Sequence, residues 1–167
     1  MINVVLFEPE IAGNVGNIMR TCAASGVRLH LIEPFGFLWN DKLIKRTGAN
    51  HIDDCEHFVY EDLDDFFSKN SGKYYFITRY GKKAHSAFEY SFEENIYFFF
   101  GKESTGLPKE LLAANLDNCL RIPMKENIRS LNVSNTVAII VYEALRQNDY
   151  KGLSLKEVIK GEDYLSQ

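Results

Sequence analysis

Short apolar runs alternate along the chain with stretches in which apolar side chains recur at helical spacing. Six runs predict strands: Ile2–Phe7, Leu29–Ile32, His57–Tyr60, Tyr74–Thr78, Ile96–Phe100 and Cys119–Ile122. Four stretches predict helices: Asn17–Ser25, Leu63–Ser68, Pro108–Ala114 and Ser134–Gln147. Runs without in/out alternation favour strands buried on both faces. We therefore predict an α/β fold, an open, mostly parallel six-stranded sheet with helices on both faces.

Several residues mark where these helices begin and end. Gly26 suits the end of the first helix, because glycine adopts the left-handed conformation without a Cβ clash. Asn14 or Asn17 is expected to cap its start, with Arg20 on its solvent face. Pro108 suits the first position of the third helix. These residues predict where the first helix begins and ends and where the third helix begins.

Length and composition indicate one compact domain. The chain has 167 residues, 46% of them hydrophobic, which excludes a disordered or fibrous protein. We expect a single domain over 1–152 and a charged amphipathic tail over 153–167. No apolar run is long enough to span a bilayer and no signal peptide is recognisable, so we expect no membrane association. The three cysteines lack a CxxC spacing, which argues against disulfides and zinc and favours a cytoplasmic protein without a metal.

The net charge of −4 disfavours an RNA partner if only the sum is considered. The distribution of the charges along the chain changes this expectation, because seven of the 23 acidic residues lie within residues 53–65. The basic residues lie largely in or beside turns: Arg20, Lys42, Lys45, Arg46, Arg79, Lys82, Lys83, Lys102, Arg121, Lys125 and Arg129. A local basic surface could supply the phosphate contacts that dominate RNA affinity.

Three polar, partly glycine-rich segments follow predicted strands, where ligands bind in open α/β sheets. The first, residues 8–20, is open to two readings, a phosphate-binding turn or a plain strand-to-helix connection. The second, residues 101–108, places Glu103 between two glycines and matches no P-loop. The third, residues 121–134, is an irregular loop leading into the last helix, and such loops often carry function.

Together the three segments resemble the motifs of the SPOUT-class RNA methyltransferases, in their SpoU-like branch, which methylates ribose 2′-hydroxyls. The first motif resembles Asn-x-Gly-Asn-x-x-Arg, present from Asn14 to Arg20. The second resembles Gly-x-Glu-x-x-Gly-Leu-Pro, present from Gly101 to Pro108, and the third resembles Ile-Pro-Met followed by Ser-Leu-Asn-Val-Ser, present from Ile122 and from Ser130. The resemblance spans about residues 2–152. It departs from the family at Ala12-Gly13, where a proline-containing pair is commoner.

The resemblance implies a C-terminal trefoil knot and a homodimer. Periodicity alone argues against a knot, since knotted connections are nearly absent from proteins. The resemblance also implies S-adenosyl-L-methionine (AdoMet) as methyl donor and S-adenosyl-L-homocysteine as product. By the same resemblance, the cofactor-binding residues are Ile77, Thr78, Gly101, Ile122, Met124, Ser130 and Leu131.

The resemblance further implies a catalytic set of Arg20, Asn14, Glu103, Ser130, Asn132 and Tyr142. A guanidinium has no lone pair to offer at neutral pH, so we interpret Arg20 as a clamp on a substrate phosphate that also stabilises alkoxide charge. Asn14 and Glu103 are expected to orient Arg20 and the ribose, and Ser130 and Asn132 to shape the knot. Tyr142 matches a tyrosine near the dimer and tRNA face, although it could equally be a packing aromatic.

The short chain resembles the members that methylate the wobble nucleotide 34 of tRNA, C or modified U, with the anticodon stem-loop of leucine tRNAs as expected partner. Two alternatives stay open. One is a ribose methyltransferase for another tRNA position or for ribosomal RNA. The other is a non-catalytic nucleotide- or RNA-binding module that uses Glu33 to contact a ribose. His85 could meet substrate, but a solvent-facing loop histidine is favoured.

Overall fold

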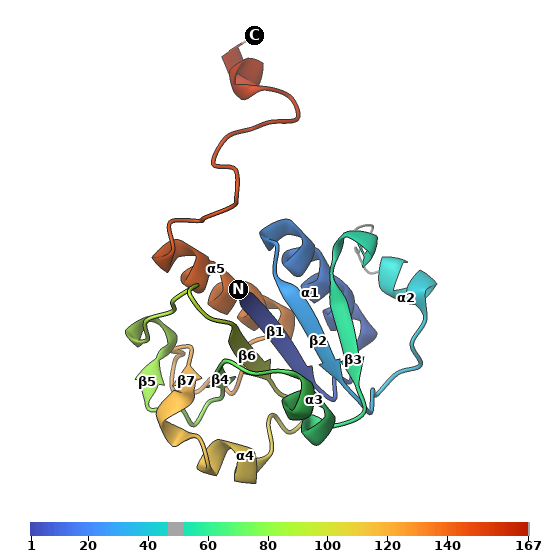
Figure 1. Ribbon diagram of the computed structural model, residues 1–167, viewed down its shortest axis with the longest axis vertical. Helices are drawn as coiled ribbons and strands as arrows, with labels where there is room; N and C mark the ends of the chain where they lie inside the picture. Colours follow the sequence, from blue (N-terminus) through green and yellow to red (C-terminus); the bar gives the residue numbers. More distant parts are fainter. Residues whose placement is uncertain (47–51, 167) are drawn as a thin grey trace.

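The computed structural model describes residues 1–46 and 52–166. In this part of the chain seven parallel strands form one sheet in the order β3-β2-β1-β6-β4-β7-β5 (Figure 1). Their bounds are β1 Ile2–Phe7, β2 Arg28–Ile32, β3 His57–Tyr60, β4 Lys73–Ile77, β5 Lys83–Ala84, β6 Ile96–Phe100 and β7 Cys119–Arg121. The carboxyl ends of all these strands lie at the same edge of the sheet.

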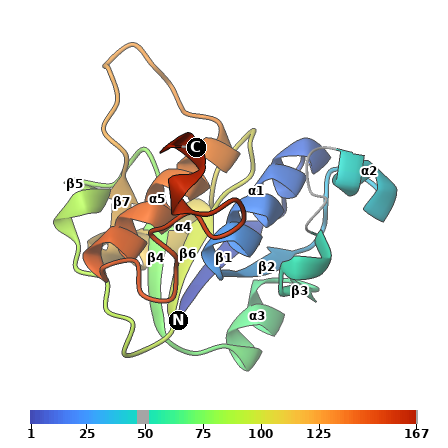
Figure 2. The same cartoon turned by 90° about the horizontal axis from the view of Figure 1, so that it is seen from above.

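Helices cover both faces of the sheet, as predicted. Their bounds are α1 Ala12–Ser25, α2 Asp41–Arg46, α3 Leu63–Lys69, α4 Lys109–Ala113 and α5 Val133–Gln147. Viewed from above, α1 and α5 lie on one side of the sheet and α3 on the other (Figure 2). Short 3₁₀ turns complete the described elements at Ile52–Asp54, His85–Ala87, Leu116–Asn118 and Glu162–Ser166.

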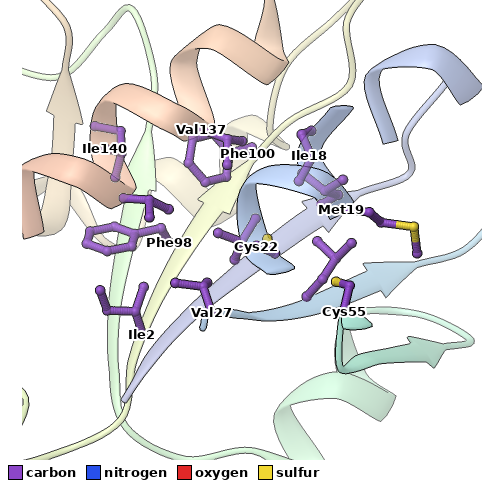
Figure 3. Close-up of a cluster of buried hydrophobic side chains, with 14 of the residues drawn as sticks. Ile2, Ile18, Met19, Cys22, Val27, Cys55, Phe98, Phe100, Val137 and Ile140 are labelled. Atoms are coloured by element: carbon purple, nitrogen blue, oxygen red, sulfur yellow. The ribbon is translucent and has the colours of Figure 1, made fainter. Parts of the chain in front are cut away.

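The central strands are buried on both faces, so alternate side chains enter two different cores. On β6, Phe98 and Phe100 join the cluster beneath α1 and α5, where Ile18 and Val137 meet them (Figure 3). Phe99 points into the second cluster with Phe66 of α3 and Leu112 of α4. Apolar burial on both faces explains why these runs lack alternation.

The structure corrects several boundaries. The sheet has seven strands instead of the predicted six, because the two-residue strand β5 is too short to leave a periodic signal. The prediction also missed α2, and α1 begins at Ala12 instead of Asn17. Neither Asn14 nor Asn17 caps α1, because both lie within the helix and Ile11 occupies the N-cap. Pro108 occupies the N-cap of α4, one position earlier than predicted.

The ends of α1 and α5 follow the expected chemistry. Gly26 closes α1 in the left-handed conformation, with φ of 66°. The Asn132 side chain caps α5, accepting hydrogen bonds from the backbone N–H groups of Ser134 at 2.9 Å and Asn135 at 3.3 Å. Asn132 therefore has a structural role as well as a place in the third motif.

A buried polar cluster lies within the half of the sheet formed by β1, β2 and β3. The two ring nitrogens of His30 are 2.8 Å from the Tyr60 hydroxyl and 3.1 Å from Asn3 Oδ1. Burial lowers the pKa of His30 to about 4, and the nearby Arg28 guanidinium adds to this effect while Glu56 opposes it. His30 is therefore neutral at physiological pH.

Beyond α5 the chain leaves the body of the molecule and projects away from it (Figure 1). Several apolar side chains of this tail are exposed: Leu155, Val158, Ile159 and Leu165. This arrangement is compatible with the predicted division at residue 152, which stays a prediction. In the described part of the chain, no helix is both long and apolar enough to cross a membrane.

Candidate active site

The loops that follow β1, β4, β6 and β7 meet at the carboxyl edge of the sheet around a pocket of about 600 Å³. All seven predicted cofactor-binding residues line it: Ile77, Thr78, Gly101, Ile122, Met124, Ser130 and Leu131. Four predicted catalytic residues line it too: Asn14, Glu103, Ser130 and Asn132. The segment between β7 and α5, which carries the third motif, arches away from the sheet (Figure 2). The fold thus gathers the three motifs at one site.

The loop after β6 is held in a tight turn that leaves no room for side chains at its base. Lys102 and Gly106 exchange two backbone hydrogen bonds, of 3.2 and 2.9 Å. Gly106 has φ of 74°, a conformation that favours glycine. A Cβ on Gly101 would lie 2.1 Å from the carbonyl carbon of Gly106. Both glycines of the second motif are therefore required by the backbone path.

A chain of hydrogen bonds links the three motifs. One carboxylate oxygen of Glu103 accepts from Asn14 Nδ2 at 3.0 Å and from the backbone N–H of Ile11 at 3.2 Å. The other oxygen accepts from the backbone N–H of Glu10 at 2.9 Å. Asn14 Oδ1 in turn accepts from Asn132 Nδ2 at 3.0 Å. Glu103 thus binds the start of α1, where the helix dipole favours an anion.

Glu10, in the loop after β1, makes the reciprocal contact to the loop after β6. Its carboxylate accepts from the backbone N–H and from the hydroxyl of Ser104, both at 2.8 Å. These hydrogen bonds, the hydroxyl first, hold the pKa of Glu10 below its usual value. The loops after β1 and β6 are therefore joined by two adjacent carboxylates, each binding the backbone of the other loop.

The pocket lining is basic. Arg79, Arg121 and Arg129 line it, and in residues 1–46 and 52–166 none of them forms an ion pair with a carboxylate. Lys102 is the exception, because its ammonium pairs with Glu8. Glu103 is the one acidic residue in the lining, and its oxygens already accept hydrogen bonds. Such a pocket is suited to an anionic ligand.

Two predicted catalytic residues lie outside the pocket. Arg20 is exposed on α1, about 9 Å along the helix and about 120° around it from Asn14, as helical geometry requires for six residues. No hydrogen bond joins it to Asn14 or Glu103 in the described part of the chain. Tyr142 lies on α5 with 43% of its surface exposed. Neither the packing nor the hydrogen bonds of this single chain bring them to the pocket.

Some residues that contribute to the site are not among those predicted from the sequence. Tyr80 lines the pocket beside Arg79, two residues beyond the predicted Thr78, and that proximity was the available signal. Glu10 gave no signal, because its partner Ser104 lies 94 residues away. His85 was expected to face solvent, but it is half-buried, and its Nδ1 is the single buried side-chain nitrogen or oxygen without a hydrogen-bond partner in the described residues.

The residues that line the pocket are suited to an organic ligand. Within residues 1–46 and 52–166, no three histidine, cysteine or acidic side chains are grouped so that they could hold a metal ion. The pocket instead combines apolar side chains, such as Ile77 and Leu131, with backbone groups of tight turns and with arginines. This mixture can bind a bulky, partly apolar molecule and an anion side by side.

The fold is that of the RNA methylases of the SpoU class, since a solved structure of an RNA methyltransferase from Bacillus anthracis, 48% identical, superposes with a TM-score of 0.89 over 94% of this chain and 100% of its own. The model of the SpoU rRNA Methylase family matches residues 1–142, so the chain belongs to this family.

Several individual proteins are similar to this chain over nearly its whole length. A protein from Geobacillus stearothermophilus is 53% identical over 155 residues, covering 92% of this chain and 99% of its own. The tRNA (cytidine(34)-2′-O)-methyltransferase of Escherichia coli strain K12 is 42% identical, over 94% of this chain and 100% of its own. A solved structure described as giving insights into the 2-OH methylation of C/U34 on tRNA superposes with a TM-score of 0.82. It is 35% identical and covers 89% of this chain and 97% of its own.

Proposed function

We propose that this chain transfers a methyl group from AdoMet to the ribose 2′-hydroxyl of nucleotide 34 of tRNA. The observation that carries the proposal is the pocket in which the three motifs meet, together with the relatives that are similar over nearly the whole chain. The proposal includes leucine tRNAs as substrates and a cytoplasmic location, where tRNA is found.

The pocket fits AdoMet in size and chemistry. A volume of about 600 Å³ lies within the range of small-molecule sites. At the base of the pocket the backbone of Gly106 and Leu107 packs directly on Gly101, where a Cβ has no space. Ile77, Ile122, Met124, Ser130 and Leu131 would contact the bound cofactor. When bound, AdoMet supplies a methyl group on a positively charged sulfur, and S-adenosyl-L-homocysteine is left as product.

The residues of the chain would position the acceptor. In-line transfer requires the ribose oxygen within about 3–3.5 Å of the methyl carbon, and the hydroxyl proton must leave as the new bond forms. We interpret Glu103, Asn14 and Asn132 as the frame that holds the three loops at fixed distances. Arg20 would bind a substrate phosphate through two parallel hydrogen bonds and stabilise negative charge on the ribose oxygen.

The position of Arg20 supports a homodimer. It lies outside the pocket of its own chain, so a second copy placed against α1 and α5 could present it to the opposite pocket. Ile139 and Tyr142 give α5 an exposed apolar surface for such a contact, with exposed fractions of 38% and 43%. Under this proposal Tyr142 lies at or near the dimer interface.

Mixing two inactive variants tests whether Arg20 acts across such a dimer. We expect Arg20→Lys and Glu103→Ala to lose most of their turnover separately and to regain part of it in mixed dimers, which contain one intact site. Arg20→Lys should bind AdoMet with nearly wild-type affinity. Activity of Arg20→Lys close to that of the wild type would exclude the proposed role of Arg20.

A labelled-methyl assay tests the substrate. Purified protein and tritiated AdoMet are incubated with total tRNA and ribosomal RNA from a strain that lacks the protein, and the methylated nucleotide is then mapped. The proposal expects label in tRNA at nucleotide 34. Label confined to ribosomal RNA, to which the family description refers, would overturn the substrate assignment.

A further inference from the structure

Tyr80 is an exposed aromatic residue at the mouth of the pocket. It lines the pocket, yet 74% of its surface is accessible to solvent. The guanidinium carbon of Arg79 lies 5.6 Å from the centre of its ring, within the range of a cation–π contact. Protein packing therefore leaves most of this ring uncovered at the position where a bound substrate would enter.

The backbone beneath Tyr80 is fixed. Thr78 Oγ1 accepts a hydrogen bond from the backbone N–H of Tyr80, and Thr78 O accepts one from the N–H of Gly81, both at 3.2 Å. Gly81 packs so closely on β7 that a Cβ there would lie 2.6 Å from the carbonyl carbon of Leu120. The ring is thus exposed on a rigid turn, which lowers the entropic cost of ordering it against a ligand.

The charges around Tyr80 select the kind of ligand. Arg79, Arg121 and Arg129 line the same pocket without carboxylate partners among the described residues. Lys82 and Lys83 follow Tyr80 two and three residues later in the chain. An exposed aromatic face beside several cations matches the way in which proteins bind single-stranded nucleic acid, with bases stacked on rings and phosphates on cations. A base within a duplex is already stacked and has no free face to offer.

We propose that Tyr80 stacks on an unpaired base of the RNA substrate, at or next to the methylated nucleotide, while Arg79 binds an adjacent phosphate. This inference rests on the proposed function, and it adds a contact that selects for a single-stranded loop. Tyr80 would act mainly on RNA affinity and little on the chemical step. The ring, and not its hydroxyl, would make the contact.

Three variants test the stacking. With an anticodon stem-loop as substrate, we expect Tyr80→Ala to raise KM about tenfold with kcat little changed, since one base–aromatic stack contributes about 5- to 150-fold in affinity. Tyr80→Phe keeps the ring and should behave as the wild type. Tyr164→Ala is the matched control, because Tyr164 is 51% exposed in the distant tail and also has a cation, Lys160, 4.5 Å from its ring centre. It should leave KM unchanged.

Two further measurements separate the alternatives. Calorimetric titration should give the same AdoMet affinity for the wild type and Tyr80→Ala. A loss of AdoMet affinity would instead assign Tyr80 to the cofactor, and unchanged values of both AdoMet affinity and KM would also overturn the proposal. A stem-loop with 2-aminopurine beside nucleotide 34 reports stacking directly. We expect the wild type, but not Tyr80→Ala, to quench its fluorescence, and equal quenching by both would contradict the stacking.

The quenching measurement does not depend on turnover. If the wild type transferred no methyl group to the stem-loop, the proposed function would fail. Quenching that depends on Tyr80 would still show the base contact in that case.

Discussion

Two polar clusters lie in this sheet, and their surroundings differ. The Glu103–Asn14–Asn132 cluster joins three loops at the carboxyl edge and borders a pocket of about 600 Å³. The cluster of His30, Asn3 and Tyr60 also has its hydrogen bonds satisfied, but it is buried among aromatic rings, with Phe58 and Phe66 within 5.6 Å of His30 between ring centres.

The difference shows what separates a functional polar cluster from a structural one. Both contain polar groups that would be costly to bury without partners. At the first, the hydrogen bonds fix the positions of segments up to 118 residues apart around an open space lined by arginines. At the second, they satisfy a buried imidazole within the core. We therefore expect substitutions at the first cluster to affect activity and substitutions at the second to affect stability.

Glu103→Ala should produce the largest effect on activity. Removing the carboxylate leaves the Asn14 amide and two backbone N–H groups without their acceptor, and the loops after β1 and β6 can then move relative to each other. Because a shift of about 1 Å at an active site can cost about a hundredfold in rate, we expect kcat to fall about a hundredfold. Single-turnover methylation assays measure this. A rate within about threefold of the wild type would show that the cluster does not position the site.

His30 should give the largest effect on stability, as a function of pH. Its folded pKa is about 4 against 6.5 for the free group, so the unfolded chain takes up the proton first. The stability that a neutral His30 allows is present above pH 6.5 and is lost as the pH falls toward 4, by up to about 3 kcal/mol. Urea unfolding between pH 7.5 and 4 measures the loss.

His30→Leu is the matched variant for this pH dependence. It lacks the titrating group, so its free energy of unfolding should change less over the same pH range, although it should be lower at pH 7.5 because Asn3 and Tyr60 each lose a partner. Methylation by the folded variant at pH 7.5 should stay within about twofold of the wild type. Parallel pH curves for the two proteins would contradict the assignment of a buried neutral histidine.

Glu10→Gln should give the smallest effect. The glutamine oxygen can still accept from the backbone N–H of Ser104, but an NH2 group replaces the second carboxylate oxygen and the charge is gone. We expect kcat/KM to fall about threefold. In the wild type the connection should weaken as the pH drops through the lowered pKa of Glu10, below its ordinary value of 4.5. Ser104→Ala should match Glu10→Gln, and a much larger loss in only one of them would show that the two residues act separately.

Much of the fold could be predicted because local patterns determine it. The runs Ile2–Phe7 and Ile96–Phe100 form strands with the predicted bounds, since apolar burial on both faces leaves an uninterrupted signal. The run His57–Tyr60 also forms a strand with the predicted bounds, although three of its four residues are exposed. The strand β5 and the start of α1 could not be predicted in this way. The strand β5 has only two residues. At the N-terminus of α1 no local side chain caps the helix, and Glu103 of a distant loop accepts the hydrogen bond from the N–H of Ile11 instead.

The motifs predict which residues form the candidate site, but they do not predict the hydrogen bonds between those residues. The resemblance to the family motifs identifies Asn14, Glu103 and Asn132 as candidates, but it does not show that they bond to one another or that Arg20 lies outside the pocket. The hydrogen bonds join segments about 90 residues or more apart, and the position of Arg20 follows from the helix α1, which contains both Asn14 and Arg20. The knot and the homodimer, which the resemblance implies, remain predictions.

Calorimetric titration of the protein with AdoMet and with NAD tests the central claim most directly, that the three motif loops form a methyl-donor site. The account predicts one AdoMet per chain, no heat from NAD, and loss of AdoMet binding in Gly101→Ala, where a Cβ would displace the base of the pocket. Circular dichroism would check that this variant remains folded. Tight NAD binding without an AdoMet response, or unchanged AdoMet affinity in folded Gly101→Ala, would contradict it.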